Sequence, residues 1–137
     1  ACPTDAIIAD RVIDSRRCIS YLTIEKRTPF STEEAQMVGS WLFGCDRCQE
    51  VCPFNSAPNA HSPLPEFSED AGVGPLLSLK ELFTLKTEEQ FRARFRDTAL
   101  LRTGRSGLLR NACAVAANTG AESVIPEIFE LLTDGAE

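Results

Sequence analysis

The sequence predicts an α+β chain that is mostly helical, in parts that differ in composition. Residues 1–55 carry five of the six cysteines among short elements. Residues 77–137 show helix-capping motifs and apolar residues at helical spacing. Between them, residues 56–76 contain four of the eight prolines, which indicates an irregular linker. We therefore expect a cysteine-bearing module, a linker and a helical domain.

The cysteine-bearing part is expected to consist of short elements. The stretch AIIADRVID, residues 6–14, alternates apolar and polar side chains loosely, which indicates two brief strands or a turn. Ser31 and Glu34 have the spacing of a capping box, in which each side chain binds the backbone N–H of the other residue. We therefore expect STEEAQMVGSWLF, residues 31–43, to form a helix that leads into the next cysteines.

The second part begins with two more capped helices. Ser78 and Glu81 cap LKELFTL, and Thr87 and Gln90 cap EEQFRARFR. In the latter, two phenylalanines four residues apart share one face. The arginines between and after these phenylalanines are expected to point away from that face.

Two further helices complete the second part. SGLLRNACAVAANTG, residues 106–120, is expected to place Leu109, Cys113 and Ala116 on one apolar stripe and to stop at its final glycine. A last helix is expected from about residue 123 to 132, with its proline in the first turn, where proline is tolerated. Helices that alternate with short turns suggest a helical-repeat pair of the HEAT type.

Three cysteines stand together in GCDRCQEVCPFN, residues 44–55, and the last precedes a proline. Iron–sulfur ferredoxins bind a 4Fe–4S cluster with four cysteines in the run C-x2-C-x2-C-x3-C-P. Counting back from Cys52, Cys48 and Cys45, the next position of the run falls on Leu42. The missing thiolate must therefore come from elsewhere in the chain.

Cys18 and the pair Cys2-Pro3 are the candidates that complete a site. In two-cluster ferredoxins, the cysteine before the proline ligates the other cluster and not the cluster of its own run. Cys2 therefore looks like the end of an earlier run whose other cysteines are expected upstream of Ala1. One 4Fe–4S cluster is expected to be bound by four cysteines of this chain: Cys2, Cys18, Cys45 and Cys48. Cys52 is expected to be the one local ligand of a second cluster, which gives a partial ferredoxin-like two-cluster module.

Other interpretations stay open. Zinc held by four cysteines is common, although zinc has no need for two Cys-Pro pairs. Three disulfides would suit a secreted protein, but the chain shows no secretory leader, so reduced thiols in the cytoplasm are favoured. Cys113 is expected to be a buried small hydrophobe and His61 a solvated loop residue. Trp41 and Phe43 are expected to form an apolar wall beside the cluster.

The charge is distributed unevenly along the chain. A net charge of −6 would ordinarily argue against a nucleic-acid partner, but residues 80–111 carry eight basic and four acidic side chains. A polyanion that approaches this stretch would meet a local positive field, in spite of the negative net charge. No stretch approaches the roughly 20 uninterrupted apolar residues that are needed to span a bilayer. A cytoplasmic protein without a membrane partner is expected.

Four stretches together carry a family resemblance: ACPTDAI, RRCISYLTIE, WLFGCDRCQEVCPFN and ALLRTGRSGLLRNACAVAANTG. In this order and spacing they resemble the C-terminal part of epoxyqueuosine reductases. That family is similar in fold and cofactors to the reductive dehalogenases. The resemblance implies a cobalamin-binding domain upstream, a ferredoxin-like module with two 4Fe–4S clusters, and HEAT-like helices.

The resemblance also implies a reaction and a set of contacts. Epoxyqueuosine reductases remove the epoxide oxygen from epoxyqueuosine in tRNA, and their clusters pass single electrons to cobalamin. By motif, Ser20, Cys45 and Asp46 match positions that touch cobalamin. The catalytic acid of the family belongs to the upstream domain, so no catalytic residue is expected in this chain.

Partners follow from the same resemblance and from the basic stretch. We expect tRNA, bound at its anticodon stem-loop by Arg102, Arg105 and Arg110, an electron donor such as a flavodoxin or ferredoxin system, and the missing N-terminal cobalamin domain. The protein is expected to be a monomer. The rival hypothesis is a ferredoxin-type electron-transfer domain fused to a helical protein-docking module, which would need neither cobalamin nor tRNA.

Overall fold

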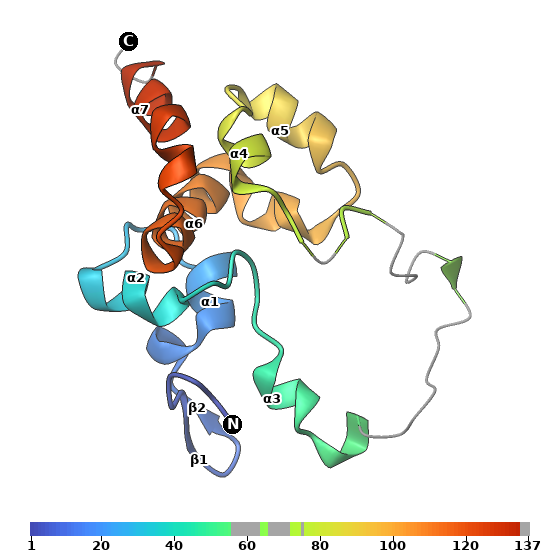
Figure 1. Ribbon diagram of the computed structural model, residues 1–137. Coiled ribbons are helices and arrows are strands. Elements are labelled where there is room, and N and C mark those ends of the chain that lie inside the picture. Colours follow the sequence, from blue (N-terminus) through green and yellow to red (C-terminus); the bar gives the residue numbers. More distant parts are fainter. Residues whose placement is uncertain (56–63, 66–71, 75, 135–137) are drawn as a thin grey trace.

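The computed structural model describes residues 1–55, 64–65, 72–74 and 76–134, and it is mostly helical with one small sheet (Figure 1). Most of the expected linker, with His61, lies outside the described residues. The first part contains β1 (Ile7–Ala9), β2 (Val12–Ile13), η1 (Ser15–Arg17), α1 (Ile19–Ile24), α2 (Thr32–Val38), α3 (Arg47–Glu50) and η2 (Pro53–Asn55). The second part contains α4 (Leu79–Phe83), α5 (Glu88–Arg94), η4 (Ala99–Arg102), α6 (Gly104–Thr119), η5 (Glu122–Val124) and α7 (Ile125–Asp134).

The two brief strands predicted from the alternating stretch are present. β1 and β2 form an antiparallel hairpin in which Ile7 faces Ile13 and Ala9 faces Val12. Arg11 makes the turn between them with a φ of 59°. The hairpin leads through η1 directly into α1.

The capping box at the start of α2 forms as predicted, but the helix is shorter than expected. The Ser31 N–H donates to Glu34 Oε2 at 2.8 Å, and the Glu34 N–H donates to Ser31 Oγ at 3.2 Å. α2 ends at Val38 because Gly39 takes a φ of 57°, which a side-chain-bearing residue rarely adopts. The chain from Gly39 to α3 therefore runs as a loop, and the prediction of a helix through residue 43 was wrong.

The helix starts of the second part are confirmed. Ser78 Oγ accepts the Glu81 N–H, and Thr87 and Gln90 form a complete capping box. Phe91 of α5 and Phe95, which follows the last residue of this helix, are 1% exposed each and meet edge to face with ring centroids 5.0 Å apart. They anchor a core cluster that α4, α5, α6 and η5 share.

α6 lies between the two parts of the molecule (Figure 1). Leu108 and Ala112 belong to the core cluster with α4 and α5, whereas Ala114 and Val115 pack in a second cluster with Leu22 of α1. A wide arc of one helix is therefore buried, with one cluster on either side of it. α6 ends at its glycine in the left-handed conformation, as predicted.

The predicted buried stripe of α6 was wrong in part. Cys113 is exposed and Leu109 is only half-buried, although Ala116 is buried as expected. The predicted stripe assumes that one face of α6 is buried. In the structure α6 has neighbours on two sides, and the side chain of Cys113 lies outside both contacts.

α7 closes the second part. Its proline stands in the first turn, as predicted. Ion pairs of 3.1 Å join it to the rest: Lys80 with Glu127, and Lys86 with Glu130. Within the described residues, none of the helices combines the length and the apolar character that a bilayer crossing would require.

Candidate metal centre

Four cysteines from distant parts of the chain line one small cavity beside the hairpin. They are Cys2, Cys18, Cys45 and Cys48. The other lining residues are Pro3, Thr4, Ala6, Ile7, Ile13, Ile19 and Arg47, so that the wall is almost wholly apolar. The structure thus brings together the four thiols that the sequence assigned to one cluster.

Hydrogen bonds from side chains to backbone carbonyls join the segment of Cys2 to that of Cys18. Thr4 Oγ1 donates to the Arg17 carbonyl at 2.5 Å, and Arg17 Nε returns a bond of 2.8 Å to the Thr4 carbonyl. The Ala6 N–H donates to Cys2 Sγ at 3.3 Å. The chain therefore folds back across thirteen residues, so that both cysteines line the same cavity.

Cys18 occupies the N-cap position of α1. Its carbonyl accepts the Leu22 N–H at 2.9 Å, and its N–H donates to the Ser15 carbonyl at 3.1 Å. Ile19 and Leu22, 3% and 0% exposed, bury the inner face of this helix. The thiol is therefore fixed to an element that is itself anchored in the core.

The other two thiols lie where the loop from Gly39 meets α3. Gly44, with a φ of 74°, turns the chain directly before Cys45, and its N–H donates to Thr23 Oγ1 at 2.9 Å. Cys48 lies within α3. Leu42, which occupies the empty position of the cysteine run, packs against the core of the second part instead.

The surroundings shift the pKa values of two of these thiols in opposite directions. Burial raises the pKa of Cys45, and the neighbouring thiols of Cys18, Cys2 and Cys48 raise it further. Burial also opposes ionisation of Cys2, but hydrogen bonds from Thr4 and from the Ala6 and Ile7 N–H groups outweigh it and lower its pKa. Ionisation is therefore easier for Cys2 than for Cys45 in the absence of a bound cation.

Cys52 lies apart from this group. It follows α3, is half-buried, and donates its N–H to the Gln49 carbonyl at 3.1 Å. It is not among the described residues that line the cavity. All six cysteines lie in the described part of the chain, and none of them forms a disulfide.

The donor set fits an iron–sulfur cluster. Thiolates are the usual ligands of 4Fe–4S clusters, and the apolar wall is the environment that tunes their potential. In the described part of the chain, no three His, Cys, Asp or Glu side chains are gathered closely enough to hold one metal ion. In a 4Fe–4S cluster each of the four thiolates binds a different iron, so the sulfurs need not converge on a single point. The four cysteines of this cavity could hold such a cluster.

The residues that match cobalamin contacts are not gathered at one place. Ser20 is half-buried in α1 and lines neither this cavity nor the second pocket. Cys45 lines the cysteine cavity. Asp46 is exposed, accepts a bond of 2.9 Å from Gln49 Nε2, and lines the second pocket.

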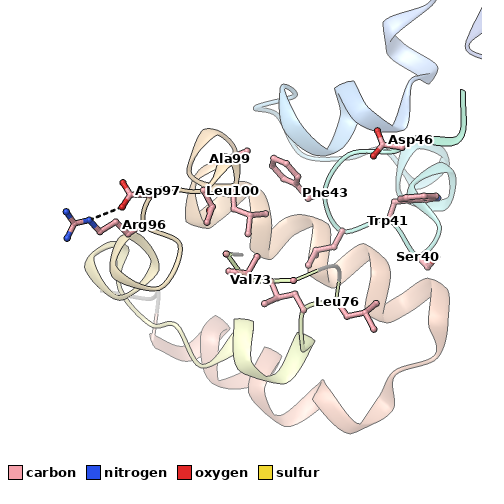
Figure 2. A pocket seen from close by; sticks show the side chains of 15 residues that line it. Ser40, Trp41, Phe43, Asp46, Val73, Leu76, Arg96, Asp97, Ala99 and Leu100 are labelled. Carbon is pink, nitrogen blue, oxygen red and sulfur yellow. Dashed lines mark ion pairs between the residues drawn. The ribbon is translucent and has the colours of Figure 1, made fainter. Parts of the chain in front are cut away.

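Figure 2 shows this second, larger and more open pocket, between the loop before α3 and the second part. Trp41, Phe43 and Leu100 contribute to its apolar lining, and the ion pair of Arg96 with Asp97 lies at its edge. The expectation that Trp41 and Phe43 wall the cysteine cavity was wrong. Both residues line the second pocket, and neither is among those that line the cysteine cavity.

The three arginines expected to bind tRNA all have partners within the chain. Arg102 Nε lies 2.7 Å from Glu25 Oε1, and Arg105 Nε donates to the Leu85 carbonyl at 2.7 Å. Arg110, half-buried, donates to backbone carbonyls of the first part. Arg102 is the most exposed of the three, with two thirds of its side chain accessible (67%).

Sequence reasoning missed two buried polar residues close to the cysteines. Thr23 and Asn111 are both 0% exposed and bond to the backbone around Gly44. The available signal was the asparagine itself, a polar residue in the middle of the apolar run LLRNACAVAA. A buried asparagine needs partners for its amide, which marks it as a structural link.

Comparison with known families agrees with the thiol geometry. Residues 1–55 match the family described as 4Fe-4S double cluster binding domain. This match covers the hairpin, α1, α2 and α3 together with all five cysteines outside α6.

Known relatives cover most of the chain. The epoxyqueuosine reductase of Cyclobacterium marinum is 40% identical over 111 residues, which are 81% of this chain and 34% of the relative. That of Shewanella oneidensis is 38% identical over 132 residues, which are 95% of this chain and 32% of the relative. The chain therefore spans about a third of the length of the relatives it matches.

Solved structures give the same result. The epoxyqueuosine reductase of Bacillus subtilis matches with a TM-score of 0.77 at 30% identity, over 100% of this chain and 36% of that chain. The enzyme of Streptococcus thermophilus matches with a TM-score of 0.76 at 26% identity, over 100% of this chain and 35% of that chain. By sequence and by fold, the chain is similar to one part of the epoxyqueuosine reductases, about a third of their length.

Proposed function

We propose that this chain is the C-terminal, electron-relaying and tRNA-binding part of an enzyme that reduces epoxyqueuosine to queuosine in tRNA. The observation that carries the proposal is the gathering of four cysteines around one cavity in a chain whose relatives are epoxyqueuosine reductases. In this proposal residues 1–55 are a partial ferredoxin-like module, 56–76 a linker and 77–137 a HEAT-like helical domain.

The cavity would hold one complete 4Fe–4S cluster on Cys2, Cys18, Cys45 and Cys48. Cys52, apart from the cavity, would be one ligand of a second cluster whose other cysteines belong to the part of the relatives outside this chain. Support comes from the family match over residues 1–55, which is named for a double cluster. Three of the four cysteines are half-buried and Cys48 is exposed, so the apolar wall would limit the access of water mainly on the side of the other three.

The proposed reduction of the epoxide requires electrons that are delivered one at a time. Loss of an epoxide oxygen as water, with formation of a carbon–carbon double bond, consumes two electrons and two protons. A 4Fe–4S cluster carries one electron at a time, so two transfers through the cavity would serve one turnover. Cobalamin, when bound by the remainder of the enzyme, would supply the low-potential reductant of the epoxide. Ser20, Cys45 and Asp46 would contact it.

The proposed partners of the chain are those that the sequence led us to expect. The electron donor would be a flavodoxin or ferredoxin system, and the remaining part of the enzyme would carry the cobalamin domain. The anticodon stem-loop of tRNA would meet Arg102, Arg105 and Arg110, of which Arg102 offers the most exposed side chain. We propose a monomer that acts in the cytoplasm.

One observation favours a second candidate, an electron-transfer domain fused to a helical protein-docking module. Several arginines of the basic stretch are already paired with carboxylates, including Arg92 with Glu88 and Arg94 with Glu81. Exposed pairs of this kind are weak and can exchange for phosphates. Binding of tRNA by the chain therefore separates the two candidates.

Anaerobic reconstitution of the chain with iron and sulfide tests the cluster assignment. The wild-type chain should turn brown, contain about four irons and four sulfides, and give a 4Fe–4S electron paramagnetic resonance signal after reduction. Replacing any of the four cavity cysteines by serine should remove most of this iron, since one thiolate ligand is lost. Cys113→Ser is the matched control, because its thiol is exposed and lies outside the cavity.

Cys52→Ser should likewise leave the complete cluster in place. A colourless protein that binds one zinc ion per chain would contradict the assignment. So would a Cys18→Ser variant with the iron content of the wild type.

A further inference from the structure

We infer that Asn111 and Thr23 are positioning residues for the proposed cluster, because together they fix the loop that presents Cys45. The inference rests on the proposed function in that it takes Cys45 to be a ligand. Neither side chain lines the cysteine cavity, so neither is a ligand itself.

Asn111 links α6 to two backbone segments of the first part. Its side chain is 0% exposed. Its amide Nδ2 donates to the Thr23 carbonyl at 2.7 Å and to the Leu42 carbonyl at 3.0 Å. Both acceptors are carbonyls, which fixes the amide with its NH₂ group toward the loop.

Thr23 continues this link to the residue that precedes Cys45. Its hydroxyl Oγ1 accepts the Gly44 N–H at 2.9 Å and donates to the Ile19 carbonyl at 2.8 Å. Leu42 on one side and Gly44 on the other are therefore both held by side chains from outside the loop. The helix that carries Thr23 also carries Cys18 at its N-cap, so one short element sets the positions of two ligands.

The loop lacks the hydrogen bonds of a regular element, although Leu42 and Phe43 also pack against the core of the second part. Between Val38 and Arg47 the chain forms no helix or strand, and Gly44 holds a φ of 74°. In a regular element the backbone polar groups would satisfy one another. Here a buried amide and a buried hydroxyl replace that network, and the position of the Cys45 sulfur depends on them.

The direction of the consequence follows from the chemistry of iron–sulfur sites. Groups around a metal ligand orient it and tune the metal, and their loss commonly weakens metal affinity by about tenfold or more. A loosened loop would expose the cluster to chelators and would change the hydrogen bonding at its sulfurs. Both effects can be measured without any enzymatic turnover.

The chain supplies its own matched control in Asn118. This residue lies seven positions after Asn111, two turns along α6, and its Nδ2 also donates to two carbonyls, Ala35 at 2.7 Å and Gly39 at 3.0 Å. Its partners are in α2 and at Gly39, the first residue of the loop and six positions before Cys45. Asn118 therefore makes the same kind of bond at the far end of the loop, without holding the residues next to Cys45.

The test compares four variants of the 137-residue chain after anaerobic reconstitution: Asn111→Ala, Thr23→Val, Thr23→Ser and Asn118→Ala. Two quantities are measured, the rate at which an iron chelator removes the cluster and the reduction potential of the cluster. Asn111→Ala and Thr23→Val should lose iron about tenfold faster than the wild type and should show a shifted potential. Thr23→Ser retains the hydroxyl and should behave like the wild type, as should Asn118→Ala.

Folded Asn111→Ala and Thr23→Val variants with the wild-type rate and potential would overturn the inference. If Asn111→Ala does not fold, the Thr23 pair decides, because valine matches the shape of threonine and only the hydroxyl is lost. An effect of Asn118→Ala as large as that of Asn111→Ala would also overturn it, since general destabilisation would then explain both. A wild-type chain that takes up no cluster would contradict the proposed function instead.

Discussion

The guanidinium of Arg110 lies over the ring of Phe30, 4.1 Å from its centre, and donates to the carbonyls of Leu22, Lys26 and Thr28. Burial lowers its pKa, and the nearby Arg27 lowers it further, but an arginine keeps its charge at any ordinary pH. This residue therefore joins α6 to the segment between α1 and α2.

Replacing Arg110 by methionine should lower the free energy of unfolding by about 1.5–3 kcal/mol, because carbonyls that are in part buried lose charged donors. Arg92→Met is the matched control, since Arg92 is exposed and forms an exposed ion pair with Glu88, and should cost less than about 0.5 kcal/mol. Urea denaturation of both variants measures the difference. Equal losses would show that Arg110 has no special structural role.

Arg102 and Arg105 are better placed than Arg110 for testing the proposed interaction with tRNA. Replacing both by glutamine should weaken binding of a tRNA anticodon stem-loop, and the slope of log affinity against log salt should fall by about one for each phosphate that the variant no longer binds. Filter binding at several salt concentrations measures both quantities. Arg16→Gln, an exposed arginine in η1, is the control. Unchanged affinity and slope would favour the protein-docking candidate.

At the scale of elements, α2 begins with interactions that are local in sequence and partly charged. Glu34 accepts the Ser31 N–H and pairs with Lys26 at 3.1 Å. The bond from Ser31 and the charge of Lys26 outweigh burial and lower the pKa of Glu34 below its ordinary value of 4.5. The start of this helix therefore depends on a deprotonated carboxylate.

The pH dependence of stability follows from this lowered pKa. The contribution of Glu34 is fully present above the ordinary value of 4.5 and is lost as the pH falls through the lower pKa of the folded state. Glu34→Gln should cost less than about 1 kcal/mol at neutral pH, because solvent screens the pair, and the cost should vanish in acid. Unfolding free energies from pH 7 down to about pH 3 measure this effect. A cost that persists unchanged in acid would contradict it.

At the scale of the whole molecule, the two parts recognised from composition share one helix. α6 contributes Leu108 and Ala112 to the core with α4 and α5, and Ala114 and Val115 to the core with α1 and α2. Loss of either cluster would expose a face of the same helix. The two parts should therefore unfold together.

Phe91→Leu tests this cooperativity, because Phe91 lies in the helical part, 1% exposed, and Trp41 lies in the other. The substitution should destabilise the chain by about 1 kcal/mol, since it removes an edge-to-face pair of rings. Trp41 fluorescence and far-ultraviolet circular dichroism should show the same lowered midpoint. A fluorescence midpoint that does not move would show that the parts unfold independently.

Local features were predictable from the sequence to a large extent. The capping boxes at Ser31 and Thr87 and the glycine stop of α6 depend on residues within a few positions of each other. The end of α2 was missed because the helical pattern continues past Gly39, and only the backbone angle of that glycine ends it.

Of the candidate site, the sequence predicted the identity of the four cavity cysteines but not what holds them. The spacing of the cysteines and the proline that follows a cysteine can be read directly from the sequence. The support from Thr23 and Asn111 joins residues 88 positions apart, and no local pattern encodes that distance.

The sequence by itself determined the helix starts, the choice of cysteines and the family resemblance, because these depend on short spacings and on motif identity. The tertiary structure decided which polar groups are buried, that Cys113 is exposed, and that Trp41 and Phe43 line the second pocket and not the cysteine cavity. Burial is a property of what packs against a residue, and here that packing is made by elements far apart along the chain.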